Sequence, residues 1–115
     1  TEIRHLSNPC SADFMSLAGE IEDHANNTPL VVQKLRKAAD NLAYVYGMEM
    51  IHGCQAIDLR MRKSSIRLGK GTEAAWKAFR KEISLYENDR PISPDIQKAY
   101  EFIKSNVLLS EVEYK

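Results

Sequence analysis

The sequence predicts an all-α protein built on one long helix, over about residues 29–63, with two shorter helices after it. Apolar residues recur every three or four positions along these stretches, and no segment shows the sustained alternation of a strand. Prolines and small polar residues mark the expected helix starts. With 115 residues and 43% hydrophobic content, the chain can bury one modest core, so we expect a single domain.

Residues 1–28 show no helical period and are expected to be irregular. Pro9 stands among small and polar residues between Asn8 and Asp13, a composition typical of a loop. The stretch from Glu20 to His24 then places three carboxylates and a histidine within five residues. This concentration of charge, directly before the most apolar part of the chain, makes the stretch a candidate functional site.

The long helix is predicted from Pro29 to about Lys63. Asn27 or Thr28 can cap its first turn, where the missing N–H of Pro29 costs little. Its apolar positions are Val31, Leu35, Ala39, Leu42, Tyr46, Met50, Cys54, Ile57 and Met61. Such a helix measures about 50 Å, whereas a compact domain of this size measures about 35 Å across. We therefore expect the helix to pack inside a larger bundle, by self-association or against further polypeptide.

Few polar residues interrupt the middle of this helix. Glu49, His52 and Gln55 recur at three-residue steps, and we expect them to form a hydrogen-bonded network with one another or with a neighbouring helix. A basic run follows, in which cations complement the helix dipole and are expected to be solvated. The run consists of Arg60, Arg62, Lys63, Arg67 and Lys70.

A second helix is predicted over residues 73–87. Gly69 and Gly71 bracket a turn that leaves Thr72 to cap this helix. Residues 69–72, which read Gly-Lys-Gly-Thr, do not satisfy the phosphate-loop pattern, so we interpret them as a turn and cap. The aromatic residues of the chain fall on helical spacings and are expected to pack rather than to stack on bases.

The third helix is expected from Pro94 to about Ser105. A loop with two prolines precedes it, Ser93 can cap it, and Asp95 in its first turn favours the helix dipole.

Charge and composition exclude several classes of partner. Sixteen basic and sixteen acidic residues cancel, so nothing in the net charge calls for nucleic acid or an anionic membrane. No apolar run approaches the roughly 18 residues of a membrane span, and the first residues lack the apolar core of a signal peptide. We therefore expect a cytoplasmic protein, in which Cys10 and Cys54 are reduced thiols.

Four stretches of the chain resemble the C-terminal third of the histidine and aromatic amino acid ammonia-lyases. That family has a loop with Asn-Pro and a nearby Asp, a Gln-Glu-Asp-His element, a long helix ending in Gln-Ala-Leu-Asp-Leu-Arg, and an Asp-Arg followed by Pro-Asp-Ile. The matching stretches are "LSNPCSAD" with Asn8-Pro9 and Asp13, "EIEDH" with Glu22-Asp23-His24, "NLAYVYGMEMIHGCQAIDLR" with Gln55 to Arg60, and "DRPISPDIQKAYEFI" with Asp89-Arg90 and Pro94-Asp95-Ile96. The resemblance covers essentially all of residues 1–115.

The resemblance implies a fold, a reaction and a cofactor. Family members are homotetramers with a central bundle of long helices, and they remove ammonia from an amino acid to leave an unsaturated acid. Their electrophile, a 4-methylideneimidazole-5-one group, is made from an Ala-Ser-Gly triplet that this sequence does not contain. The upstream region with the catalytic tyrosine and the substrate-binding arginine is also missing. The chain then corresponds to a C-terminal portion that needs the N-terminal lyase portion, or other subunits, and is inactive alone.

Glu22 matches the family's active-site glutamate, which lies near the substrate amine. We expect it to be catalytic, with Asp23 and His24 as candidates for the substrate pocket. Two interpretations from the residues themselves stay open: an acidic lead-in favoured by the helix dipole, and a structural, hydrogen-bonded His24. The spacing fits neither a zinc nor a calcium motif, so no metal is expected. Ile21 departs from the family's usual Gln, which leaves the substrate open.

The expected function is therefore that of a portion of an ammonia-lyase acting on a small amino acid. Within the family, we expect histidine catabolism, with L-histidine converted to urocanate. A phenylalanine or tyrosine ammonia-lyase and an aminomutase are alternatives. A stand-alone helical oligomerisation module without catalysis is the alternative from another class.

Overall fold

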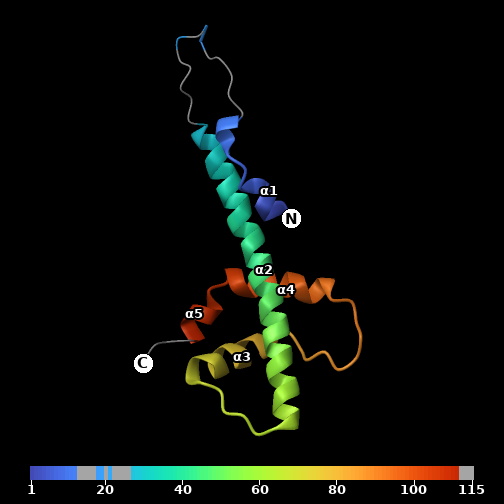
Figure 1. Cartoon of the computed structure of the whole chain (residues 1–115). Coiled ribbons are helices and arrows are strands. Elements are labelled where there is room, and N and C mark those ends of the chain that lie inside the picture. The colour runs from blue at the N-terminus through green and yellow to red at the C-terminus, as the bar shows by residue number, and fades with distance from the viewer. Residues whose placement is uncertain (13–17, 20, 22–26, 112–115) are drawn as a thin grey trace. The chain divides into compact units, whose positions relative to one another are not determined.

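The computed structural model describes residues 1–12, 18–19, 21 and 27–111. Every regular element within these ranges is helical, which confirms the predicted all-α class (Figure 1). The chain divides into two compact units, residues 1–42 and 43–115, and the long helix α2 contributes to both. The elements are α1 (Glu2–Leu6), the 3-10 turn η1 (Cys10–Ala12), α2 (Thr28–Lys63), α3 (Lys70–Glu82), α4 (Ser93–Lys104) and α5 (Val107–Glu111).

The long helix α2 confirms the main prediction. It starts at Thr28, and the Asn27 carbonyl accepts the N–H of Val31 at 3.0 Å. It ends at Lys63, with basic residues in its last turn as the helix dipole favours. None of the helices in the described ranges combines the length and apolar content needed to cross a bilayer.

The face of α2 that packs on its own chain differs from the predicted apolar row. The buried residues are Ala43, Gly47, Ile51 and Cys54. Of the predicted row, only Cys54 is buried, whereas Leu35 and Tyr46 are 68% and 50% exposed. Since α2 carries apolar residues on nearly all sides in this region, periodicity alone could not identify which row faces α3 and α4.

The core of the second unit lies where α2, α3 and α4 meet. Phe79 of α3 and Phe102 of α4 form its centre in an edge-to-face pair, with ring centroids 5.3 Å apart. Gly47 of α2 allows α4 to approach closely, because a Cβ at this position would lie 3.0 Å from the carbonyl carbon of Ala99. The predicted packing role of the aromatic residues is confirmed for these two rings.

The boundaries predicted for the second helix were wrong at both ends. Gly69 occupies the N-cap position of α3, so Thr72 lies inside the first turn and does not cap it. The helix ends at Glu82 rather than at residue 87. Ile83 is extended, with φ −130° and ψ 117°, and is 1% exposed. We attribute the early end to the burial of this β-branched side chain, which favours extended backbone.

The last part of the chain holds one helix more than predicted. α4 starts at Ser93, one residue before the predicted Pro94, and no side chain caps it. Asn106, with φ 60°, then ends that segment, and α5 follows. Leu108 of α5 packs against the core. A helix of five residues is too short to show a hydrophobic period, so the sequence did not predict it.

The prediction of an irregular segment over residues 1–28 was wrong for α1 and η1. Glu2 lies in the first turn of α1, and Arg4 and His5 lie in its last turn, an arrangement that complements the helix dipole. Glu2 also forms an ion pair with Lys37 of α2 at 2.6 Å. These interactions stabilise a single turn that has no hydrophobic period.

The predicted network of Glu49, His52 and Gln55 does not form. His52 Nδ1 lies 2.8 Å from the Met48 carbonyl of its own helix, and Gln55 bonds the backbone of Tyr86. His52 thus bonds within its own helix, whereas Gln55 makes a tertiary contact.

Candidate active-site segment

The predicted site residues lie outside the described residues. Glu22, Asp23 and His24 belong to the segment 13–26, of which only Ala18, Gly19 and Ile21 are described. The structure does show the residues at both ends of this segment, on the η1 side and on the α2 side. These ends belong to the first unit, whereas the polar clusters built from the other family-like stretches belong to the second.

The two ends of the segment are held together by a side chain. Nδ2 of Asn27 donates a hydrogen bond of 3.1 Å to the carbonyl of Cys10, 17 residues earlier. Nζ of Lys34, in the second turn of α2, donates to the Asn8 carbonyl. The start of η1 and the start of α2 therefore lie next to each other.

The helix α1 lies beside this place and is tied to α2 through Glu2. In addition to its ion pair with Lys37, Glu2 accepts a hydrogen bond of 2.9 Å from Asn41. These two bonds hold the pKa of the exposed Glu2 carboxyl below its usual value. A mainly apolar hollow of about 440 Å³ opens here; its walls include Ile3, Leu6, Pro9, Val31, Leu35 and Ala38.

Two family-like residues of α2 are engaged in structural contacts. Nε2 of Gln55 donates to the Tyr86 carbonyl at 2.9 Å, and Oε1 accepts the Tyr86 N–H at 3.1 Å. Asp58 accepts hydrogen bonds from Trp76 Nε1 at 2.9 Å and from Arg80 Nε at 2.7 Å. Gln55 and Asp58, both from the stretch "QAIDLR", thus hold α3 and the loop after it on α2.

Arg90 organises the loop that leads into α4. Its guanidinium donates to the carbonyls of Ser84 and Leu85, both at 3.0 Å, and to Oδ2 of Asp95 at 2.9 Å. The Tyr86 hydroxyl donates to the same Oδ2. The guanidinium also lies 3.8 Å from the centroid of the Tyr86 ring, a cation–π contact. Arg90 and Asp95 of the matching stretch "DRPISPDI" therefore make hydrogen bonds that fix the loop before α4.

The pKa shifts of Asp95 and Tyr86 follow from these contacts. Burial acts to raise the pKa of the Asp95 carboxyl, but the hydrogen bonds from Tyr86 and Arg90 outweigh burial and lower that pKa. Burial, and then the bond to Asp95, raise the pKa of the Tyr86 hydroxyl. Near neutral pH, the carboxylate and the phenol thus both stay in the states that bond each other.

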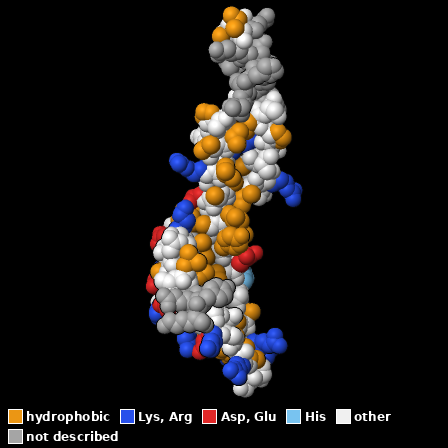
Figure 2. All heavy atoms as spheres, turned by 90° about the vertical axis from the view of Figure 1, so that its left-hand side faces the viewer, with side chains coloured by type: hydrophobic (Ala, Val, Ile, Leu, Met, Phe, Trp, Pro, Cys, Tyr) orange, Lys and Arg blue, Asp and Glu red, His pale blue; other side chains and the backbone are white. Residues whose placement is uncertain are grey.

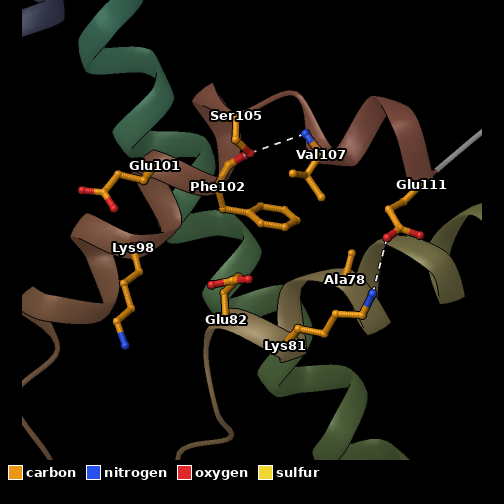
Figure 3. A pocket seen from close by; sticks show the side chains of 9 residues that line it. All are labelled: Ala78, Lys81, Glu82, Lys98, Glu101, Phe102, Ser105, Val107 and Glu111. Atoms are coloured by element: carbon orange, nitrogen blue, oxygen red, sulfur yellow. Dashed lines mark hydrogen bonds and ion pairs between the residues drawn. The ribbon is translucent and has the colours of Figure 1, made fainter.

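A second hollow, of about 290 Å³, lies where α3, α4 and α5 meet (Figure 3). Phe102 and Ala78 supply apolar lining, and Lys81 pairs with Glu111 at 3.4 Å. Groups of both charges surround it, and no three metal-ligating side chains converge anywhere in the described ranges. We assign this hollow no ligand.

Comparison with known proteins identifies the family. The family model for aromatic amino acid lyases matches residues 1–81, more than half of the chain. The chain belongs to the aromatic amino acid lyase family. The predicted family is therefore confirmed.

Curated and solved relatives of this lyase chain agree with that assignment. Histidine ammonia-lyase 1 of Fusobacterium nucleatum is 35% identical over 113 residues, which is 98% of this chain and 22% of that protein. Histidine ammonia-lyase of Clostridium tetani is 35% identical over 115 residues, with the same coverage. The lyase chain thus spans about a fifth of the length of these relatives.

A solved lyase structure is similar in sequence and in fold. It is the ergothioneine-degrading enzyme ergothionase from Treponema denticola, in complex with desmethyl-ergothioneine sulfonic acid. It matches 92% of this chain with a TM-score of 0.84 and 50% identity, and the match covers 21% of that protein.

The residues of this lyase chain do not fit formation of the family's cofactor. The 4-methylideneimidazole-5-one group is made from Ala-Ser-Gly, and the 115 residues contain no such triplet. We therefore derive no step through that group from this chain.

Sequence reasoning missed the contacts that surround the segment. Asn27 was considered as a helix cap, but nothing in its neighbourhood indicated a partner at Cys10. Gln55 was predicted to join a hydrogen-bonded network, but nothing indicated the Tyr86 backbone as its partner. Lys34 gave no signal, because its partner is a backbone carbonyl distant in sequence.

Proposed function

We propose that the chain is the C-terminal portion of a carbon–nitrogen lyase that releases an amine from an imidazole-bearing amino acid. The observation that supports this most directly is the family match together with relatives that act on histidine or ergothioneine. The reaction breaks the Cα–N bond, removes a proton from the β-carbon and leaves a carbon–carbon double bond.

Glu22 is proposed to act on the substrate amine. By its match to the family's active-site glutamate, its carboxylate would accept a proton or hydrogen-bond the ammonium group of L-histidine. The trimethylammonium group of ergothioneine carries no N–H, so with that substrate the carboxylate would act as a proton acceptor or as a counter-charge. Asp23 and His24 are proposed to line the same pocket. The remaining groups, including the residue that binds the substrate carboxylate, would come from the N-terminal portion of the lyase or from other subunits.

Substitution of Glu22 tests this role in the complete lyase. Glu22→Gln keeps the shape of the side chain and removes its basicity, and we expect kcat to fall by about 10²- to 10⁴-fold. Glu20→Gln is the matched control, since it removes the same charge from the same acidic stretch. Equal activity of the Glu22→Gln and wild-type enzymes would remove Glu22 from the mechanism. Equal losses in both variants would assign the effect to the charge of the stretch.

The relatives suggest two candidate substrates, ergothioneine and L-histidine. Identity to ergothionase is 50%, against 35% to the two histidine ammonia-lyases. Ile21 also departs from the family's usual Gln beside the glutamate. These observations favour ergothioneine, the trimethylammonium counterpart of a sulfur-bearing histidine, over the L-histidine expected from the motifs.

Product analysis decides between the two substrates. With ergothioneine, elimination releases trimethylamine and a sulfur-bearing unsaturated acid. With L-histidine, it releases ammonia and urocanate. We expect ultraviolet absorbance of the conjugated acid to rise faster with ergothioneine, and faster turnover of L-histidine would reverse the assignment.

The long helix is proposed to serve assembly. Leu35, Leu42 and Tyr46 of α2 are exposed although apolar, as are Leu30, Val31 and Val32. Figure 2 shows uncovered hydrophobic side chains on the face that it presents. We propose that this surface packs in the helical bundle of a homotetramer and that the chain is inactive on its own.

A further inference from the structure

We propose that an apolar groove around Gly53 of α2 seats a helix from the upstream portion of the same lyase. The backbone of that helix would cross α2 at Gly53, as the backbone of α4 approaches α2 at Gly47. This inference rests on the part of the proposed function that makes the chain a C-terminal portion of a longer lyase, and it does not depend on the substrate.

The groove is a third hollow, of about 440 Å³, in the second unit, where α3, α4 and α5 lie around the second half of α2 (Figure 1). Its mainly apolar lining comes from all four helices and includes Met50, Cys54, Ile57, Trp76, Ile103 and Leu108. Among the described residues that line it, Glu49 carries the one charge. Because protein interiors are close-packed, an open apolar hollow of this size is suited to receive further side chains.

Gly53 belongs to the lining of this groove, and none of the described segments explains a glycine there. Inside a helix, glycine is less favourable than alanine because its backbone loses more freedom on folding. At Gly47 the glycine is explained, since a Cβ would lie 3.0 Å from the carbonyl carbon of Ala99. At Gly53 a Cβ would meet no other described segment within 4 Å. A bare stretch of helix backbone facing an apolar groove therefore indicates close approach of a second backbone.

The upstream portion of the lyase is the occupant that the observations favour. The chain spans 22% of the first histidine ammonia-lyase compared above and 21% of ergothionase, so about four-fifths of such a lyase lies outside it. A second copy of this chain fits less well, because a two-fold contact here would oppose one hollow to the same hollow and leave both unfilled. The expected occupant is a helix with an apolar face, a small residue where it crosses Gly53 and a cation near Glu49.

Gly53→Ala separates this groove from ordinary helix stability. In the 115-residue chain the added methyl group meets open space, and we expect the midpoint of thermal unfolding to rise by about 2–5 °C. In the complete lyase the same methyl group would meet the crossing helix, and the midpoint should fall by at least about 2 °C. A rise in both proteins would overturn the inference, because the groove would then be open in the complete lyase.

His52→Ala is the matched control for this comparison. His52 is the adjacent residue of α2, is exposed, and does not belong to the lining of the groove. The substitution should therefore shift the midpoints of the 115-residue chain and of the complete lyase in the same direction. Opposite shifts for Gly53→Ala alone would assign the effect to the groove.

Photo-crosslinking in the complete lyase identifies the occupant. p-Benzoylphenylalanine replaces Thr72, an exposed residue in the lining of the groove, and peptide mass spectrometry locates the adducts. We expect adducts with a segment upstream of this chain. Adducts confined to residues 1–115, or no protein adduct, would overturn the inference. Neither measurement uses turnover, so its failure is distinguished from failure of the proposed reaction, which Glu22→Gln and product analysis test.

Discussion

At the scale of single residues, the polar side chains of the family-like motifs divide into two groups. Gln55, Asp58, Arg90 and Asp95 are occupied by hydrogen bonds that fix α3, α4 and the loop between them. Glu22 belongs to the segment that these contacts do not involve. A sequence motif therefore does not by itself separate structural from catalytic residues.

Removal of the Asp95 charge should open the loop before α4. Asp95→Asn takes the charged acceptor from Arg90 and Tyr86, and we expect a loss of about 2 kcal/mol in the free energy of unfolding. Urea denaturation followed by circular dichroism measures this loss. Asp89→Asn, on the exposed part of the same loop, is the control and should change stability by less than about 0.5 kcal/mol. Equal stability of both variants would contradict the structural role of Asp95.

The same carboxylate makes stability depend on pH. Because the folded-state pKa of Asp95 is lowered, its contribution is complete above about pH 4, the ordinary value for aspartate. The contribution is lost as pH falls through the lower folded-state pKa, since the unfolded state binds the proton first. The difference in stability between wild type and Asp95→Asn should therefore shrink below about pH 4. A difference that grows with acidity would contradict the lowered pKa.

The candidate site residues remain a prediction from the sequence, because they lie outside the described residues. Glu22, Asp23 and His24 stand out because charge is concentrated there, and the family match gives Glu22 a role. Nothing local in the sequence pointed from Asn27 to Cys10, because a side chain that bonds a distant backbone carbonyl leaves no pattern at its partner. Such contacts follow only from the fold.

At the scale of elements, α2 was predictable and the short helices were not. A helix as long as α2 repeats its apolar period many times, so its type and both ends follow from sequence. The five residues of α1 or of α5 cannot show a period, and tertiary contacts with α2 and α3 decide them. The early end of α3 is likewise set by burial of Ile83, which is a tertiary effect.

Two glycines of α2 should respond oppositely to alanine. At Gly47 a Cβ would lie 3.0 to 3.1 Å from the backbone of Ala99 and Tyr100, and we expect Gly47→Ala to destabilise by about 1–3 kcal/mol. At Gly53 nothing lies within 4 Å, so Gly53→Ala should stabilise the chain by about 0.5–1 kcal/mol through helix propensity. Thermal unfolding of the two variants tests the pair. A stabilised Gly47→Ala variant would contradict the close approach of α4.

At the scale of the whole molecule, the exposed apolar residues of α2 support the proposal that this helix packs against a partner. Leu35 is 68% exposed, and the neighbouring apolar residues of the helix are uncovered as well. Scattered apolar residues are ordinary on protein surfaces, but a row along one helix marks an interaction site. This agrees with a chain that spans about 22% of its relatives' length.

We expect the chain to self-associate at micromolar concentration. Sedimentation velocity measures this directly, and Leu35→Lys should reduce the associated fraction because it places a charge in the apolar row. Arg36→Glu, on the adjacent exposed position, controls for charge reversal alone. A stable monomer at these concentrations would contradict the proposed assembly role of α2.

The most direct test of the proposed lyase role is amine release by the reassembled enzyme. The chain is combined with the upstream portion of its lyase, and release of trimethylamine or ammonia is followed together with the absorbance of the unsaturated acid. We predict turnover when both portions carry their wild-type residues, and a large loss when this chain carries Glu22→Gln. Unchanged turnover with Glu22→Gln, or equal turnover without this chain, would contradict a role for it in the active site.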